Sequence, residues 1–283
     1  MVKTDFDLQF GKKRAKIVKE EGIQLTQNLI GKHLNQEPEA FIADFGLEKE
    51  DRSVLHSSTV SIIIPAYNEE KNVDKVISET IAVMKLLNLP YEIILVDDGS
   101  TDKTGSIASF FNIKVLINQK NCGKGYSLKK ALRHAHGDII VTIDSDGEHK
   151  PKEIVTLLEA VSNGTDVAAG SRFLNDQSAV TTKLNQIGNH FFNLAIMSLT
   201  GKRVTDSQTG FRAIKREVLE KLNLQSDGYE IETEITVKSL RSGFVFKELP
   251  ITVERRRFGA SKLKLLVDGK RILRTILTTS FVH

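Results

Sequence analysis

A pattern repeated along the middle of the chain constrains its fold most. Three short apolar runs, 62–64, 93–96 and 139–143, are each followed by a polar turn and then by a helix-like stretch. Apolar runs of this length that alternate with helical segments are typical of repeated strand–helix units, in which the strands form a parallel sheet. The sequence therefore predicts an α/β fold with a mostly parallel sheet flanked by helices.

The alternation can be followed through most of the chain. Pro151 is typical of the first position of a helix, and the regular order of elements changes after residue 170. The predicted strands are 60–64, 91–96, 113–117, 138–143, 166–170, 211–214 and 244–254, and the predicted helices are 70–87, 103–111, 124–135, 151–162, 183–199, 215–222, 230–242 and 262–280.

Three segments are expected. Residues 1–58 carry no strand signal and are expected to form an N-terminal helical extension of unknown role, with a break around 31–38. A structural or partner-binding role is the default for this extension, and a surface anchor formed by its basic half is the alternative. Residues 59–255 hold the sheet, and residues 256–283 are expected to form a basic, amphipathic C-terminal helix at a membrane surface.

Composition narrows the class of protein. The 283 residues are enough for one large domain with extensions. A net charge of +4 and the absence of Trp are unlike a nucleic-acid-binding protein. The single cysteine, Cys122, excludes a disulfide within the chain and favours a reducing, cytoplasmic setting. No signal peptide is recognised and no apolar run approaches the roughly 20 residues of a membrane span, so we expect a chain that is soluble or rests on a surface.

Acidic residues follow the predicted strands where ligands are expected. Asp144-Ser145-Asp146 comes directly after the apolar run 139–143, and further polar turns at 97–102 and 65–70 follow the two other runs. Open α/β sheets bind ligands at the carboxyl ends of their strands, and carboxylate oxygens suit Mg²⁺ or Mn²⁺. An isolated Asp-x-Asp is more often a solvated turn, but three such turns at one edge predict a site for phosphate and metal.

Other motifs each leave two interpretations open. The turn 121–125 could bring its backbone and Lys124 to a phosphate, or could simply turn; neither a Walker motif nor a dinucleotide-binding G-x-G-x-x-G is present. Arg172 could pair with a diphosphate or an anionic acceptor, or could neutralise the acidic residues. Asp206 could cap a turn, or serve as a base or as an acceptor for a sugar hydroxyl. The sequence does not decide between these roles.

A dense basic run, Arg255–Lys262, precedes the last predicted helix. That helix carries Lys264, Lys270, Arg271 and Arg274 among apolar residues. A basic amphipathic helix of this kind can rest on anionic lipid headgroups, or can pack on the domain.

Taken together, these motifs resemble those of a known family. They are similar to the motifs of GT-A inverting glycosyltransferases of the polyprenyl-phosphate sugar synthase group, which includes dolichyl-phosphate mannose and glucose synthases. The similar segments are Ser61–Glu70, Val96–Asp102, Asn121–Gly125, Asp144–His149, Gly170–Arg172, Asp206–Phe211 and Arg256–Lys262. The resemblance implies a GT-A (Rossmann-like) fold. It also implies metal-dependent inverting transfer of a hexose from a GDP- or UDP-sugar to a polyprenyl (dolichyl) phosphate, with Mg²⁺ or Mn²⁺, at the cytoplasmic face of a membrane.

The resemblance also implies roles for particular residues. The nucleotide sugar would be bound by Pro65, Ala66, Tyr67, Glu69, Val96, Asp98, Lys124 and Asp144. The divalent cation would be bound by Asp144, Asp146 and Glu148. The acceptor phosphate would be bound by Arg172, Arg256, Ser261 and Lys262. Asp206, Arg172 and Arg256 would form the catalytic group, with the two arginines more important than Asp206, because a phosphate monoester is largely ionised at neutral pH and needs no strong base.

The chain departs from the family pattern at two places. Many relatives carry Gln where this chain has Glu148, and mannose synthases carry an Arg and a Ser where this chain has Asn185 and Asn189. A glucose or N-acetylhexosamine donor is therefore favoured at least as much as mannose. Three alternatives remain: transfer to a hydroxyl acceptor with Asp206 as base, a nucleotidyltransferase, and a non-catalytic subunit that binds a nucleotide sugar.

Overall fold

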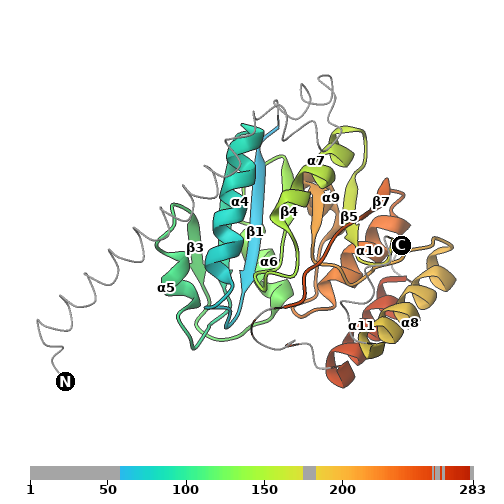
Figure 1. Ribbon diagram of the computed structural model, residues 1–283. Helices are drawn as coiled ribbons and strands as arrows, with labels where there is room; N and C mark the ends of the chain where they lie inside the picture. Colours follow the sequence, from blue (N-terminus) through green and yellow to red (C-terminus); the bar gives the residue numbers. More distant parts are fainter. Residues whose placement is uncertain (1–57, 175–182, 257, 259–261, 263–264, 281–283) are drawn as a thin grey trace, which may run out of the picture.

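The computed structural model describes residues 58–174, 183–256, 258, 262 and 265–280. The predicted N-terminal extension, Ser261 and Lys264 lie outside the described residues. Within them, seven strands form one sheet in the order β3-β2-β1-β4-β6-β5-β7, with helices on both sides (Figure 1). No helix in this described part is long and apolar enough to cross a membrane.

The sheet is mostly parallel, as the sequence predicts. Neighbouring strands run in parallel except β6, which is antiparallel to both β4 and β5. Because β6 runs in the opposite direction, the turn that precedes it lies at the same edge as the carboxyl ends of the other strands. The strands are β1 (Val60–Ala66), β2 (Tyr91–Asp97), β3 (Lys114–Ile117), β4 (Ile139–Thr142), β5 (Val167–Ser171), β6 (Arg212–Lys215) and β7 (Phe246–Pro250).

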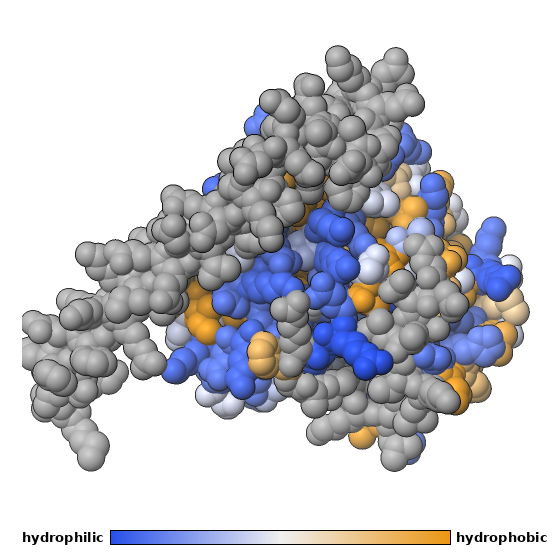
Figure 2. Space-filling model, in the orientation of Figure 1, coloured by the Kyte–Doolittle hydropathy of each residue, from blue (hydrophilic) through white to orange (hydrophobic). Residues whose placement is uncertain are grey.

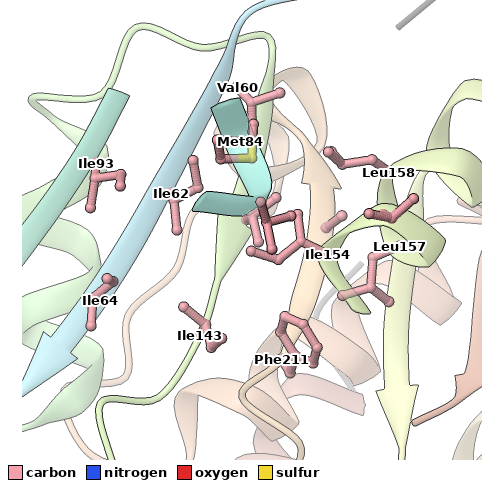
Figure 3. Packing of buried hydrophobic residues seen from close by; sticks show 14 of the residues in the cluster. Val60, Ile62, Ile64, Met84, Ile93, Ile143, Ile154, Leu157, Leu158 and Phe211 are labelled. Atoms are coloured by element: carbon pink, nitrogen blue, oxygen red, sulfur yellow. The ribbon is translucent and has the colours of Figure 1, made fainter. Parts of the chain in front are cut away.

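Apolar residues on both faces of the sheet are covered by helices. Ile62 and Ile64 of β1 pack with Met84 of α4 and Ile154 of α7 (Figure 3), while Ile63 between them belongs to the core on the opposite face. Successive side chains of a strand point to opposite faces, so an unbroken apolar run requires helices on both. One face carries α4 (Val73–Leu87), α5 (Thr104–Ala108) and the 3₁₀ turn η1 (Pro151–Glu153) with α7 (Ile154–Ser162); the other carries α6 (Lys124–Leu132), α9 (Arg216–Leu222) and α10 (Ile231–Arg241).

Two further helices pack against α10. They are α8 (Lys183–Thr200) and α11 (Leu265–Ser280), which lie side by side in Figure 1. Ile196 of α8, Val237 of α10 and Ile272 and Ile276 of α11 form a separate buried cluster. The last helix therefore buries one face on the domain and keeps basic residues on its exposed face.

The predicted strand 244–254 is too long. Its partner in the sheet, β5, ends at Ser171, which is opposite Pro250, and proline has no N–H to continue a ladder. Beyond Pro250 the chain crosses the sheet edge: Val253 forms an isolated bridge with His149, and Glu254 N donates to Glu148 O. The segment after β7 is thus brought to the acidic turn that follows β4. The predicted helix 103–111 is also shorter, and α4 begins at Val73 because residues 67–72 form a turn.

Candidate active site

The predicted polar turns converge on one edge of the sheet. The turns after β1, β2, β4 and β5 stand at the carboxyl ends of strands that run in the same direction. The turn 206–210 before β6 joins them because that strand is reversed. The topology therefore brings five polar segments, far apart in sequence, to one site.

Lys124 lies between two carboxylates. Its Nζ is 2.5 Å from Asp144 Oδ1 and 2.9 Å from Glu232 Oε1, and only 12% of its side chain is exposed. Burial alone would lower the pKa of Lys124, but the carboxylates of Asp144 and Glu232 outweigh burial and raise this pKa above its usual range. Lys124 is therefore a fixed cation beside the first aspartate of the Asp-x-Asp turn.

Gly210 makes this packing possible. A Cβ atom at position 210 would lie 2.2 Å from Lys124 Nζ and 2.6 Å from Asp144 Oδ2. The carbonyl oxygen of Gly210 accepts a hydrogen bond from Thr142 Oγ1 at 2.7 Å, which fixes the turn on β4. Only a residue without a side chain leaves room here for the Lys124–Asp144 ion pair.

Asp98 holds the glycine-containing turn. Its Oδ1 accepts hydrogen bonds from Asn118 Nδ2 at 2.7 Å and Cys122 N at 2.9 Å, and its Oδ2 accepts from Gly123 N at 2.8 Å. Gly123 has a φ of 105°, where other residues are strained, and a Cβ there would be 2.3 Å from Asp227 O. The carboxylate of Asp98 thus shapes the turn that leads into α6 and Lys124.

The segment after β7 places cations among the remaining acidic residues. The guanidinium of Arg256 contacts Asp146 through Nη2, and Arg256 Nε lies 3.2 Å from Glu148 Oε1. Lys262 Nζ lies 2.7 Å from Glu69 Oε1 and donates to the carbonyl oxygens of Tyr67 and Asn68. Residues from the two ends of the sheet domain therefore meet at the carboxyl end of β1.

The carboxylates after β4 have the chemistry of a site for a hard divalent cation. Burial, and after it the neighbouring Asp146, raise the pKa of Glu148, although Arg256 opposes the shift, so these carboxylates lie close enough to act on one another. In the described part of the chain no three acidic or histidine side chains surround one point. The physical reason is that Asp144 faces Lys124, whereas Asp146 and Glu148 face Arg256. Carboxylate oxygens are suitable ligands for Mg²⁺ or Mn²⁺. The assignment of Asp144, Asp146 and Glu148 as the ligands remains a prediction.

Arg172, which follows β5, is held by Asp206. Asp206 Oδ2 accepts from Arg172 Nε at 2.7 Å and Oδ1 accepts from Nη2 at 2.8 Å, a bidentate pair. The side chain of Asp206 has no exposed surface. Burial would lower the pKa of Arg172, but Asp206 outweighs burial and raises it. Asn189 of α8 also donates to Asp206 Oδ1 and to Thr205 O.

Several residues in the site were not predicted from the sequence. Glu232 pairs with Lys124, Arg212 is fully buried behind the turn 206–209, and Glu248 of β7 accepts hydrogen bonds from the N–H groups of Thr205 and Asp206. His149 is stacked on Phe211 at 5.2 Å between ring centroids, with Nδ1 3.9 Å from Asp144 Oδ2. The one sequence signal for Glu232 is that it is an acidic residue near the start of a predicted helix. No local sequence pattern singles out Arg212, Glu248 or His149.

The predicted nucleotide-binding residues are not equally accessible. Pro65 lies near the end of β1, Tyr67 and Glu69 lie on the turn after it, and Glu69 is 6% exposed. Ala66 is buried, and Val96 is fully buried in the core beside α6. The side chain of Val96 therefore packs within the protein, and only its backbone is near the strand end.

The fold is that of a GT-A-like glycosyltransferase. It is similar to the crystal structure of glucosyl-3-phosphoglycerate synthase from Mycobacterium tuberculosis, with a TM-score of 0.66 and 20% identity over 83% of this chain and 82% of that chain. At that identity the likeness establishes the fold alone. The predicted GT-A fold is confirmed.

The chain belongs to glycosyl transferase family 2, whose model matches residues 61–223, more than half of its length. It is 30% identical over 232 residues to the polyprenol monophosphomannose synthase of Mycolicibacterium smegmatis, covering 77% of this chain and 86% of that protein. It is 34% identical over 212 residues to the dolichol-phosphate mannosyltransferase of Pyrococcus furiosus, covering 72% of this chain but only 59% of that protein. It is also 33% identical over 226 residues to an uncharacterized protein of Methanocaldococcus jannaschii. The predicted resemblance to polyprenyl-phosphate sugar synthases is confirmed.

Proposed function

We propose that this protein transfers a hexose, with inversion, from a GDP- or UDP-sugar to a polyprenyl phosphate, with a divalent cation, at the cytoplasmic face of a membrane. The product would be a lipid-linked sugar phosphate for glycan or glycoprotein assembly. One observation carries the choice of acceptor: both carboxylate oxygens of the buried Asp206 accept hydrogen bonds from Arg172. Asp206 therefore orients a cation for an anionic acceptor and is not available as a base for a hydroxyl acceptor.

The donor would bind across the turns after β1, β2 and β4. In this proposal Pro65, Tyr67 and Glu69 surround the nucleoside, while Asp98 shapes the turn that presents Lys124. Support comes from the relatives named as polyprenyl-phosphate transferases and from structures of a fold neighbour described in complex with Mn²⁺ or Mg²⁺ and UDP. Lys124 beside Asp144 provides positive charge where a diphosphate would lie.

Asp144, Asp146 and Glu148 would hold the divalent cation. When bound, such a cation supplies Lewis-acid stabilisation of the charge that develops on the leaving diphosphate. Arg256 would then exchange its contacts with Asp146 and Glu148 for the acceptor phosphate, which it would bind together with Lys262 and the predicted Ser261.

The acceptor phosphate would act as the nucleophile. A phosphate monoester has a second pKa near 6, so most of it is dianionic at neutral pH and no residue has to remove a proton. Arg172, held rigidly by Asp206, would fix the phosphate so that it attacks the anomeric carbon opposite the leaving diphosphate, which inverts the configuration. Positioning and charge stabilisation would supply most of the rate enhancement.

Two exposed surfaces support contact with a membrane. On α8, Ile187, Phe191, Leu194 and Met197 are exposed at helical spacing on one side, and we call them the α8 stripe. The other side of α8 carries Asn189 and Asn193, which bind Thr205 O beside Asp206. The α8 stripe and the asparagines that bind the backbone beside Asp206 thus lie on different sides of one helix.

The second surface is the exposed side of α11. Lys270, Arg271 and Arg274 are exposed there, and each could contribute about 1 kcal/mol near anionic lipid. Figure 2 shows hydrophobic atoms at the lower right of the molecule, in the region where Figure 1 places α8 and α11. Replacing all three basic residues with Gln should weaken sedimentation with anionic vesicles, and added salt should do the same to the unmodified protein.

A screen of nucleotide sugars tests the proposed reaction. UDP-glucose, UDP-N-acetylglucosamine and GDP-mannose are each incubated with Mn²⁺ and one polyprenyl phosphate in vesicles. We expect release of nucleoside diphosphate that depends on the lipid phosphate. Release of pyrophosphate would indicate a nucleotidyltransferase instead, and binding of a nucleotide sugar without turnover for any donor would indicate a non-catalytic subunit.

A further inference from the structure

The start of α10 places a buried acidic residue between the two halves of the site. Glu232 is the second residue of the helix, and its side chain is 4% exposed. Its neighbours Ile231 and Ile235 are anchored in the core on the sheet, which fixes the helix start. The positive end of the helix dipole favours a carboxylate at this position. The sequence patterns gave Glu232 no role, and the proposed reaction uses it neither as a base nor as a ligand.

The two oxygens of Glu232 face two different cations. Oε1 is 2.9 Å from Lys124 Nζ, and Oε2 is 3.5 Å from Arg212 Nε. Lys124 in turn contacts Asp144 at 2.5 Å. Glu232 thus fixes the ammonium group of Lys124, which contacts Asp144 on the donor side of the site.

The second cation, Arg212, leads to the acceptor side. It has no exposed surface, and it donates through Nε to Thr209 O at 2.9 Å and through Nη2 to Ser207 O at 3.1 Å. These bonds fix the turn that carries Asp206, which holds Arg172. Burial lowers the pKa of Arg212, and the nearby carboxylates, Glu232 first among them, oppose that shift.

The resulting chain of charged residues alternates in sign and links Asp144, which follows β4, with Arg172, which follows β5. In order it consists of Asp144, Lys124, Glu232, Arg212, Asp206 and Arg172; each step is an ion pair, except that Arg212 reaches Asp206 through the carbonyl oxygen of the next residue, Ser207. Its two ends are the most exposed, with 26% of the Asp144 side chain and 18% of the Arg172 side chain accessible, while Glu232 and Arg212 in the middle are 4% and 0% exposed. We infer that Glu232 is a positioning residue that aligns Lys124 on the donor side with the Arg212-supported turn on the acceptor side; this inference rests on the proposed function.

A carboxylate is the group that this position requires. Glutamine has the same length but a single acceptor oxygen, so its NH₂ group would face one of the two cations. Aspartate keeps the charge but is one methylene shorter, so it cannot contact Lys124 and Arg212 together. The alternative is that Glu232 only neutralises buried charge, in which case its replacement would lower stability without altering ligand binding.

Nucleotide affinity separates the two roles. Isothermal titration with UDP and with GDP, each with MnCl₂, gives Kd for Glu232→Gln, Lys124→Met and the double variant. We expect Glu232→Gln to raise Kd at least about tenfold, because a charge-assisted contact is displaced. We also expect the double variant to bind no more weakly than Lys124→Met alone, because Glu232 acts through Lys124. If Glu232→Gln does not fold, Glu232→Asp is measured instead, with the same expected direction.

A matched control and a second readout complete the test. Asp166→Asn removes an ion pair with Lys215, 2.8 Å long, at the opposite end of β5, and should lower Tm without changing Kd. Glu232→Gln should also raise the acceptor KM. A Kd within twofold of the wild-type value in folded Glu232→Gln, or additive losses in the double variant, would overturn the inference. A wild-type protein that binds nucleotide but transfers no sugar would contradict the proposed function alone, because the binding arm uses no acceptor.

Discussion

Replacing Gly210 with alanine is expected to disable the donor side of the site without unfolding the protein. The new Cβ atom would lie 2.2 Å from Lys124 Nζ and 2.6 Å from Asp144 Oδ2. Non-bonded heavy atoms pack at about 3.5 Å or more, so the ammonium must move by roughly 1 Å. The 2.5 Å contact between Lys124 and Asp144 cannot survive that movement. The backbone need not change, because the atoms that must move are the ends of side chains.

The expected loss can be estimated. A hydrogen bond to a charged group contributes about 1.5–3 kcal/mol, which corresponds to a decrease of roughly 10- to 150-fold in kcat/KM. Initial rates of nucleoside diphosphate release measure kcat/KM, and a thermal melt should place Tm within about 4 °C of wild type. Gly188→Ala on α8, where an added Cβ meets nothing within 4 Å, is the matched control and should keep both values. Wild-type kcat/KM in Gly210→Ala would refute the claim that Lys124 must stay on Asp144.

Four further outcomes are expected. Asp206→Asn leaves the partly exposed guanidinium of Arg172 without its fully buried charge partner and should cost about 3 kcal/mol of stability, seen as a lower Tm; an unchanged Tm would mean that the pair is not formed. Burial would raise the pKa of Glu234, but bonds from Lys238 and two backbone N–H groups lower it below its ordinary value of 4.5. The stability it supplies is therefore present above pH 4.5 and lost as pH falls through the folded pKa, so the Tm difference between wild type and Glu234→Gln should shrink in acid. Phe191→Ser on the α8 stripe should reduce vesicle binding and leave turnover of a short, water-soluble acceptor unchanged; equal loss on both acceptors would point to a fold defect. Asp146→Asn should weaken Mn²⁺ binding, measured by titration of the metal, and chelator should abolish wild-type activity reversibly; activity that survives both treatments would remove the metal from the mechanism.

The fold was largely predictable because its central strands are apolar on both faces. The run Ile62–Ile64 needs cover on both sides, and that requirement alone indicates helices on each face of a parallel sheet. The limits of the elements were less predictable. Pro250 ends β7 because its partner β5 stops at Ser171, and that pairing joins residues far apart in sequence.

In the site, too, the features that depend on strand order were predictable, and those that depend on contacts between distant segments were not. Asp144, Asp146 and Arg172 could be placed at one edge because each follows a predicted strand, and the edge of a parallel sheet is set by strand direction. The position of Arg256 among the carboxylates depends on the chain crossing the sheet after β7, which no local pattern indicates. Glu232 could not be found either, because its partner Lys124 belongs to another helix on the same face.

The choice between a phosphate and a hydroxyl acceptor is the central claim, and a pair of matched lipids tests it most directly. One polyprenyl phosphate and the alcohol of the same chain length are presented in identical vesicles with Mn²⁺ and the active nucleotide sugar. Mass spectrometry then identifies any glycosylated lipid. With Asp206 committed to Arg172, we predict sugar transfer to the phosphate, with inverted anomeric configuration, and none to the alcohol. A glycosylated alcohol as the main product would contradict the account.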